Sequence, residues 1–267
     1  MASKNNRTDP YSTGPFSMDE PTERDRLLSL ERAKDPDTIR ILESLPINES
    51  SRCLEIGAGM GSIAYWLAAR CPKGSVVAAD IDTRNLDPRR SPNLNVQEVD
   101  ITTHEFAPSS FDLVHARAVL CHLPAREDVL ARAYRWISPG GWLVVEDVYS
   151  FPLGASPYPA MNRYAAAAHQ AAEQRGGDLR WANRLPAIMA QLGFAHIAAD
   201  ASPQLVGSGG PSDRLWRINL EQTGPHMTKA GILTKAELDD CLRLLDDPHF
   251  VDIRHIGIAA WGQKPNR

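Results

Sequence analysis

Glycines and carboxylates recur in the first half of the chain where short apolar runs end. The first case is Glu55, which is followed by Gly57, Gly59 and Gly61. Glycine adopts positive φ and places no Cβ between main chain and ligand, so this turn suits close approach of a bulky nucleoside. An apolar run with helical spacing follows at 63–69. The pattern predicts a ligand-binding turn between a strand and the N-terminus of a helix.

The spacing of these glycines distinguishes two kinds of nucleotide fold. The dinucleotide fingerprint is Gly-x-Gly-x-x-Gly. Here the third glycine comes one position earlier, and Ser62 occupies the place where that fold has glycine. The spacing therefore disfavours an NAD-dependent oxidoreductase, while a tight turn without a ligand stays open on this stretch alone.

A second carboxylate closes the next predicted strand. Residues 74–80 are small and β-branched and end at Asp80, which lies 25 residues after Glu55. An ionised carboxylate only accepts hydrogen bonds, which suits the two hydroxyls of a ribose at the tip of a second strand. Asp80 could instead cap the next turn, as could Asp82. The strand and the spacing favour ribose binding.

Together these strand tips resemble the class I S-adenosylmethionine (SAM) methyltransferases. The run from Glu55 to Gly61 resembles their motif I, and Asp100-Ile101 after strand 94–99 resembles their adenine site. The Phe-Asp-Leu-Val of strand 111–117 is typical of their fourth strand, whose following residues meet the methionine part of SAM. The resemblance implies ten cofactor-binding residues: Glu55, Gly57, Ala58, Gly59, Gly61, Asp80, Ile81, Asp100, Ile101 and Arg117.

The resemblance covers about residues 37–261 and implies the family's fold. That fold is α/β and Rossmann-like, with a seven-stranded, mostly parallel sheet, an antiparallel last strand and a helical cap. The expected strands lie at 53–56, 74–80, 94–99, 111–117, 142–148, 194–199 and 250–261. Helical patterns fill most of the intervals, including 126–137, 213–223 and 234–245.

One methyltransferase domain is expected over residues 22–261. Residues 1–21 are polar and rich in proline and glycine, which predicts a mobile N-terminal arm, and residues 262–267 form a tail. Two short lid helices, split at Asp35-Pro36, are predicted within 22–46. An alanine-rich helical stretch at about 157–192 is longer than a plain crossover needs, so we interpret it as a cap insertion.

Composition favours a small-molecule acceptor. The chain has 267 residues, 43% hydrophobic and 23% charged, with a formal net charge of -4. Such a balance gives no basic surface for nucleic acid. No segment predicts a membrane span or a secretory leader, and the four cysteines are widely spaced, so we expect a soluble, cytoplasmic protein with reduced thiols. No metal-ligand cluster stands out, and no metal is expected. A homodimer is among the assembly states open to the chain.

Two further strand tips supply candidate catalytic residues. His122 follows the fourth predicted strand, and Asp147 ends the fifth. An imidazole can take a proton from an acceptor hydroxyl or amine, and a carboxylate can orient it. Alternation along the strand puts Glu146 and Asp147 on opposite faces, so only one of them points at the acceptor. The alternative is that these residues only pack or cap. Candidate acceptor contacts are Tyr11, Tyr149, Tyr164, His169 and Trp181, although most of these residue types are ordinary packing residues.

The predicted function is methyl transfer from SAM to an O, N or C nucleophile of a small molecule, with S-adenosylhomocysteine as product. We expect a natural-product acceptor in secondary metabolism. Some proteins of this fold bind SAM without methylating, and a non-methylating reaction such as a cyclisation is the alternative.

Overall fold

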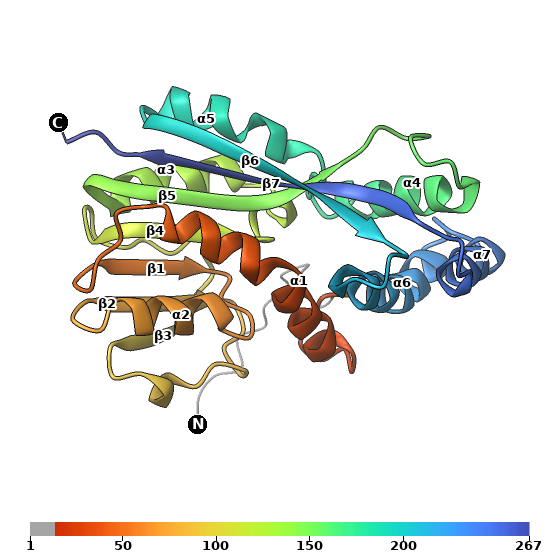
Figure 1. Ribbon diagram of the computed structural model, residues 1–267, viewed down its shortest axis with the longest axis horizontal. Helices are drawn as coiled ribbons and strands as arrows, with labels where there is room; N and C mark the ends of the chain where they lie inside the picture. Colours follow the sequence, from red (N-terminus) through yellow and green to blue (C-terminus); the bar gives the residue numbers. More distant parts are fainter. Residues whose placement is uncertain (1–13, 267) are drawn as a thin grey trace.

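A twisted seven-stranded sheet runs through the whole molecule in the computed structural model, which describes residues 14–266. The strand order is β3-β2-β1-β4-β5-β7-β6, and β7 is antiparallel to both of its neighbours. The predicted mostly parallel sheet with an antiparallel last strand is confirmed (Figure 1). The strands are β1 (Arg52–Ile56), β2 (Ser75–Asp80), β3 (Leu94–Glu98), β4 (Phe111–Arg117), β5 (Ile137–Ser150), β6 (Ala195–Val206) and β7 (Asp252–Gln263).

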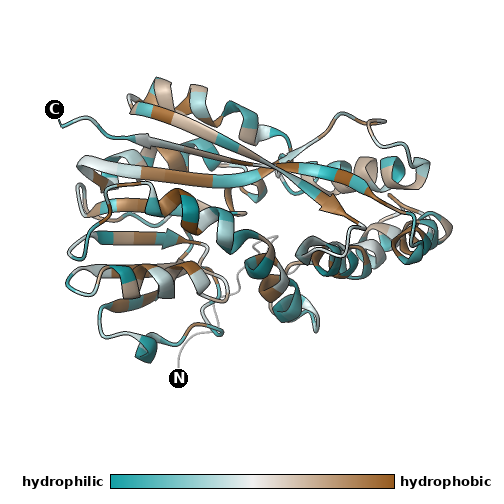
Figure 2. Ribbon diagram, viewed as in Figure 1, coloured by the Kyte–Doolittle hydropathy of each residue, from teal (hydrophilic) through white to brown (hydrophobic). Residues whose placement is uncertain are grey.

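Helices cover both faces of the parallel part of the sheet. The helix α2 (Ser62–Arg70) and the C-terminal half of α1 (Glu23–Glu43) bury their apolar side chains on one face. The other face packs against α3 (Arg126–Trp136) and α5 (Leu185–Leu192). The apolar colour runs along β4 and β5 in Figure 2, as expected for strands buried on both sides.

The helix α1 is continuous, whereas two short helices were predicted. Pro36 lies inside it. Proline removes one helical hydrogen bond and usually breaks a helix. Here long-range contacts on either side of Pro36 hold the helix together: Arg117 donates to the Asp35 carboxylate and to the Thr38 hydroxyl, both at 2.8 Å. Neither contact is visible in the local sequence, which explains the wrong prediction.

The described part of the predicted mobile arm is folded. Residues 14–21 form turns, and the carbonyl of Pro15 accepts a hydrogen bond from the Gln222 amide. The same amide donates to Glu23 at the start of α1. Residues 14–21 are therefore packed onto α1 and onto α6 (Pro211–Lys229), and residues 1–13 lie outside the described part of the chain.

The cap differs from the predicted insertion at 157–192. It consists of α4 (Pro159–Glu173), α6 and α7 (Lys235–Asp246), which share one apolar core. These helices lie beyond the carboxyl ends of the parallel strands, on long extensions of β5, β6 and β7 (Figure 1). Only α4 of the predicted segment belongs there, because Trp181 and α5 bury their side chains against the sheet. Most of the cap comes from the connection between β6 and β7.

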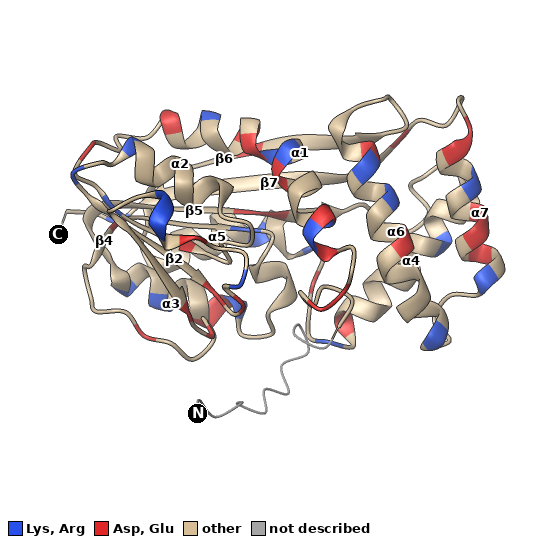
Figure 3. Cartoon of the chain, turned by 90° about the horizontal axis from the view of Figure 1, so that it is seen from below, with Lys and Arg blue, Asp and Glu red and all other residues tan. Residues whose placement is uncertain are grey.

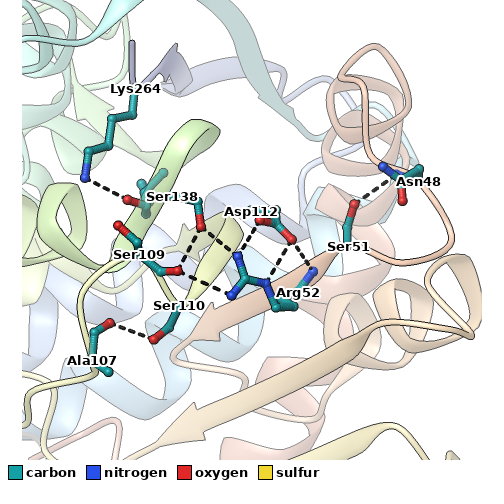
Figure 4. A network of polar contacts seen from close by, with 10 residues as sticks. Asn48, Ser51, Arg52, Ala107, Ser109, Ser110, Asp112, Ser138 and Lys264 are labelled. Carbon is teal, nitrogen blue, oxygen red and sulfur yellow. Dashed lines mark hydrogen bonds and ion pairs between the residues drawn. The ribbon is translucent and has the colours of Figure 1, made fainter. Parts of the chain in front are cut away.

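At the opposite end, a polar network fixes the start of the sheet (Figure 4). The guanidinium of Arg52 donates to Asp112 at 2.8 Å and to the hydroxyl of Ser138 at 2.7 Å. These residues begin β1, β4 and β5, so the network sets the relative register of three strands.

Acidic and basic residues are interspersed along α1 and α7 (Figure 3). Among residues 14–266, no helix has the length and apolar character needed to cross a membrane.

Close packing between α6 and α7 gives a first prediction. A Cβ on Gly224 would lie 2.4 Å from Leu238 Cδ1. We expect Gly224→Ala to lower the free energy of unfolding by about 1–3 kcal/mol through overpacking, although alanine is the better helix former. Urea unfolding measures this change. In a Leu238→Ala background the same substitution should become neutral or stabilising, and a persisting loss would contradict the packing argument.

Candidate functional site

A large cavity lies where the parallel strands end and the cap begins. Its volume is about 880 Å³. The walls come from the tips of β1, β2, β4 and β5, from α1, and from the cap helices α4 and α6. In open α/β sheets this edge is the usual place for a ligand, so the cavity is the candidate functional site.

The glycine turn after β1 forms one wall of this cavity. Gly57 and Gly59 have φ of 69° and 56°, in the left-handed region that favours glycine. A Cβ on Gly57 would lie 2.1 Å from Val119, so the loop after β4 closes directly on the turn. Gly61, with φ of 91°, precedes α2 and is outside the cavity lining. Its role is to shape the turn against Tyr65.

Asp80 ends β2 and holds the glycine turn in place. Its Oδ2 accepts from the Gly59 N–H at 2.7 Å, and its Oδ1 accepts from the Asp82 N–H at 3.1 Å. Burial raises the pKa of Asp80, while these backbone N–H groups oppose the shift. Each carboxylate oxygen has two lone pairs, so both can still accept from a ligand hydroxyl.

Three predicted residues lie beside Asp80 along the same wall. Ile81 and Ile101 contribute apolar surface, and Asp100 follows β3. One oxygen of Asp100 accepts from the N–H and hydroxyl of Thr102, at 2.8 and 2.6 Å. The other has no such local partner in the described chain. The structure thus brings the predicted adenine and ribose residues together, with Ala58 next to them.

Glu55 and Arg117 also line the cavity, but their side chains are engaged within the protein. Arg117 binds Asp35 and Thr38 of α1. Glu55 accepts from His115 Nδ1 at 2.6 Å, and the Nε2 of the same ring lies 2.9 Å from Glu146. His115 is fully buried, and sequence reasoning missed it. A histidine between the apolar residues Val114 and Ala116 of strand 111–117 was the available signal.

The bridge between Glu55 and Glu146 makes His115 a buried cation. Burial lowers the pKa of an imidazole, but the two carboxylates outweigh that effect and raise the pKa of His115 to about 9. Burial likewise raises the pKa of Glu146, and His115 reverses the shift so that it lies below the usual range. At neutral pH the protonated ring donates to both carboxylates across three neighbouring strands.

The two predicted catalytic residues both face the cavity, but in different surroundings. Asp147 is 5% exposed, and its Oδ2 accepts from Cys121 N–H and Trp181 Nε1–H, each at 3.0 Å. Its Oδ1 is buried and has no partner in the described chain. Burial raises the pKa of Asp147 to about 7, against the hydrogen bonds from Cys121 and Trp181. As strand alternation requires, Glu146 points to the opposite face.

His122 lies next to Phe16, with ring centroids 5.4 Å apart. Burial and the nearby guanidinium groups of Arg26, Arg175 and Arg126 lower the pKa of His122 to about 4. The ring is therefore neutral at pH 7, and it is a weaker base than a histidine near its ordinary pKa. Asp147 is bound by an indole and a backbone N–H, so the predicted orientation of His122 by Asp147 is replaced by a different set of contacts.

The predicted acceptor residues divide into three groups. Tyr164 lines the cavity, and its hydroxyl lies 3.0 Å from the hydroxyl of Thr223. Tyr149, His169 and Trp181 lie outside the lining, and Trp181 instead packs in the sheet core and holds Asp147. Tyr11 lies outside the described residues.

Sequence reasoning missed the contribution of α6. The residues that line the cavity have helical spacing, namely Leu215, Trp216, Asn219, Thr223, His226 and Met227, and Ala230 follows at the end of the helix. The spacing was visible in the sequence, but an amphipathic pattern does not say which apolar surface it faces. Within residues 14–266, no group of three or more histidine, cysteine or acidic side chains is arranged to hold a metal ion.

A family model described as a methyltransferase domain matches residues 54–145, which include the glycine turn and the strand tips. This match supports the predicted resemblance to the class I SAM-dependent methyltransferases. SAM is the cofactor of this family, and solved members of the fold contain SAM or S-adenosylhomocysteine.

Among curated proteins, the methyltransferase str2 of Strobilurus tenacellus is 35% identical over 151 residues. That match covers 54% of this chain and 53% of the relative, so the chain spans about half the length of that relative.

Two solved structures show the shared fold. The complex of Haemonchus contortus phosphoethanolamine N-methyltransferase 2 with phosphomonomethylethanolamine and S-adenosylhomocysteine aligns with a TM-score of 0.55 and 19% identity, over 96% of this chain and 56% of that one. The [4+2]-cyclase SpnF aligns with a TM-score of 0.53 and 18% identity, over 86% of this chain and 80% of that one.

The buried cation His115 predicts a pH-dependent stability. A raised folded-state pKa stabilises the protein fully below the unfolded value near 6.5, and this contribution is lost as the pH rises through about 9. We expect His115 to contribute about 3 kcal/mol at pH 6 that is absent at pH 10. Urea unfolding of the wild type and His115→Gln across this range measures the contribution. Equal pH slopes in the two proteins would show that His115 is not a buried cation.

Proposed function

We propose that this chain transfers the methyl group of SAM to a small-molecule acceptor bound between the sheet and the cap. The observation that supports this most is the wall formed by the glycine turn, Asp80 and the paired apolar residues Ile81 and Ile101. An acidic strand tip suits a ribose, flanking isoleucines suit a flat base, and a turn without Cβ atoms suits close approach of the methionine part.

The residues present fit SAM in a testable way. The Gly57 site is a cradle that any Cβ would fill, because Val119 lies within 2.1 Å of the Cβ position. When bound, SAM supplies a methyl group on a sulfonium, which an acceptor nucleophile displaces in line. Gly57, Gly59, Asp80 and Asp100 would hold the donor, and the protein's contribution is alignment and exclusion of water.

The cavity continues from the cofactor wall to the cap, so an acceptor can bind beside the cofactor. Its volume of about 880 Å³ lies towards the upper end of the range of about 300–1,000 Å³ for ligand pockets. The part away from the glycine turn is lined by α4 and α6, with Ala168, Ala171, Trp216 and Met227 among its apolar residues. We infer a bulky, largely apolar acceptor, in keeping with a natural product of secondary metabolism.

Asp147 is the proposed base for the acceptor, and His122 a neutral hydrogen-bond acceptor beside it. Asp147 lines the cavity, its Oδ1 has no hydrogen-bond partner in the described chain, and its pKa of about 7 matches the pH at which a general base is most useful. His122, with a pKa of about 4, is already neutral but binds a proton only weakly. This assigns proton removal to Asp147 where the acceptor nucleophile carries a proton.

A non-methylating reaction, such as a cyclisation, would use the same cofactor wall and remains the second proposal. The cyclase with the same fold shows that the architecture accommodates such chemistry. Formation of S-adenosylhomocysteine during turnover distinguishes the two, because only methyl transfer produces it.

The four cysteines are free thiols, which supports the proposed cytoplasmic setting.

The ribose assignment predicts the behaviour of an Asp80 variant. Asp80→Ala should weaken binding of S-adenosylhomocysteine by about 1.5–3 kcal/mol, because two ribose hydroxyls lose a charged acceptor. Calorimetric titration measures the affinity, and urea unfolding checks that the turn held by Asp80 stays folded. Asp82→Ala is the matched control, since Asp82 is a neighbouring carboxylate outside the cavity lining. A folded Asp80→Ala protein with unchanged affinity would refute the assignment.

The proposed base predicts a pH profile. Because Asp147 must be ionised to accept a proton, kcat should rise with pH through a midpoint near 7. Asp147→Asn keeps the acceptor oxygen for Cys121 and Trp181, and it should remove this limb and lower kcat by roughly 10²- to 10⁴-fold. Stopped assays with a confirmed acceptor, followed by S-adenosylhomocysteine formation, measure both. His122→Gln should retain the limb, and a limb that persists in Asp147→Asn would exclude Asp147 as the base.

A further inference from the structure

The turn after α4 is hydrogen-bonded to the segment that contains His122. Arg126 donates to the carbonyl of Gly176 at 2.6 Å, and the N–H of Asp178 donates to the carbonyl of Cys121 at 2.8 Å. These bonds hold residues 174–178 at the edge of the cavity. Arg175 is thereby placed in the cavity wall, close enough to His122 to influence its charge.

Three guanidinium groups surround this end of the cavity, and they are compensated to different degrees. Arg26 forms a bidentate pair with Glu23, with both distances at 2.7 Å. Arg126 donates to the carbonyls of Leu120 and Gly176, which carry no net charge. The side chain of Arg175 has no hydrogen-bond or ion-pair partner within residues 14–266, and its partial burial lowers its pKa. Positive charge therefore exceeds negative charge at this end.

The carboxylates of the cavity do not neutralise this excess. Glu55 and Glu146 are bound to His115, and Asp80 holds the glycine turn. Asp147 also lines the cavity, but its Oδ2 already accepts two hydrogen bonds and its raised pKa reduces its charge at neutral pH. A half-buried arginine without a counter-ion is costly, and an anionic ligand would remove that cost.

Arg175 also continues the cavity-facing side of α4. Residues Tyr164, Ala168, Ala171 and Ala172 precede it at helical spacing, and all line the cavity. The alanines leave room for an apolar body against α4, and the guanidinium closes the end of that surface. The arrangement suits a ligand with an apolar body and an anionic end.

We propose that Arg175 binds an anionic oxygen group, a carboxylate or a phosphate ester, on the acceptor. The identity of this ligand as the methyl acceptor rests on the proposed function. The site itself is a property of the cavity wall, and it can be tested separately from methyl transfer.

The test measures the affinity of matched amphipathic probes for the full chain saturated with S-adenosylhomocysteine. The probes are octanoate and octyl phosphate as the anions, with octanamide and octanol as their uncharged counterparts. Calorimetry at constant ionic strength should show each anion binding roughly 10- to 100-fold more tightly than its counterpart, as expected for a charge-assisted bond. The tighter of the two anions identifies carboxylate or phosphate as the preferred group.

The variant Arg175→Gln should abolish the preference for the anions while keeping the affinity for S-adenosylhomocysteine. Arg163→Gln is the matched control, because Arg163 is another α4 arginine that pairs with Glu237 and Asp240 outside this cavity. It should retain the full preference.

Equal affinities for acid and amide in the wild type, or no detectable binding of either anion at millimolar concentration, would overturn the proposal. A preference that survives in Arg175→Gln would overturn it as well. Failure of S-adenosylhomocysteine to bind would refute the proposed function instead, and the probe titrations without cofactor would still decide the anion site.

Discussion

The buried imidazole of His115 is the constraint on which the other parts of the site depend. It bonds to carboxylates of β1 and β5 from its place on β4, so one cation joins the three central strands near their carboxyl ends. Glu55 lies two residues before Gly57, and Glu146 is next to Asp147. The position of the cofactor turn and that of the proposed base are therefore set by the same ring. A buried charge of this kind is stable only with both partners present.

Arg117, which lies two residues beyond His115 on β4, connects this part of the sheet to α1. Its guanidinium donates hydrogen bonds to Asp35 and Thr38. These bonds stabilise α1 on both sides of Pro36 and position the helix over the cavity. The resemblance to known methyltransferases assigned Arg117 to the cofactor. Its hydrogen bonds give it a different immediate role, in which it positions the helix that covers the cofactor wall.

The sequence was sufficient for features that local chemistry determines. The glycine turn, the acid at the tip of β2 and the order of the strands follow from glycine spacing, β-branched runs and the position of Asp80. The continuity of α1 could not be predicted, because Pro36 is tolerated only through contacts with a residue some 80 positions away. The low pKa of His122 depends on its burial and on three arginines that three different segments bring together. The amphipathic pattern of α6 was visible, but the surface that it faces was not.

The cap helices α6 and α7 are contributed by a single excursion of the chain, which leaves the sheet after Val206 and returns at Asp252. These two residues are register partners in the β6–β7 ladder, so the excursion begins and ends at one point of the sheet. None of the residues at the cofactor wall lies within it. An excursion closed in this way can be exchanged between related enzymes, by evolution or by design, as an interchangeable module. Selectivity for the acceptor can then diverge rapidly while the machinery for the methyl donor is inherited unchanged.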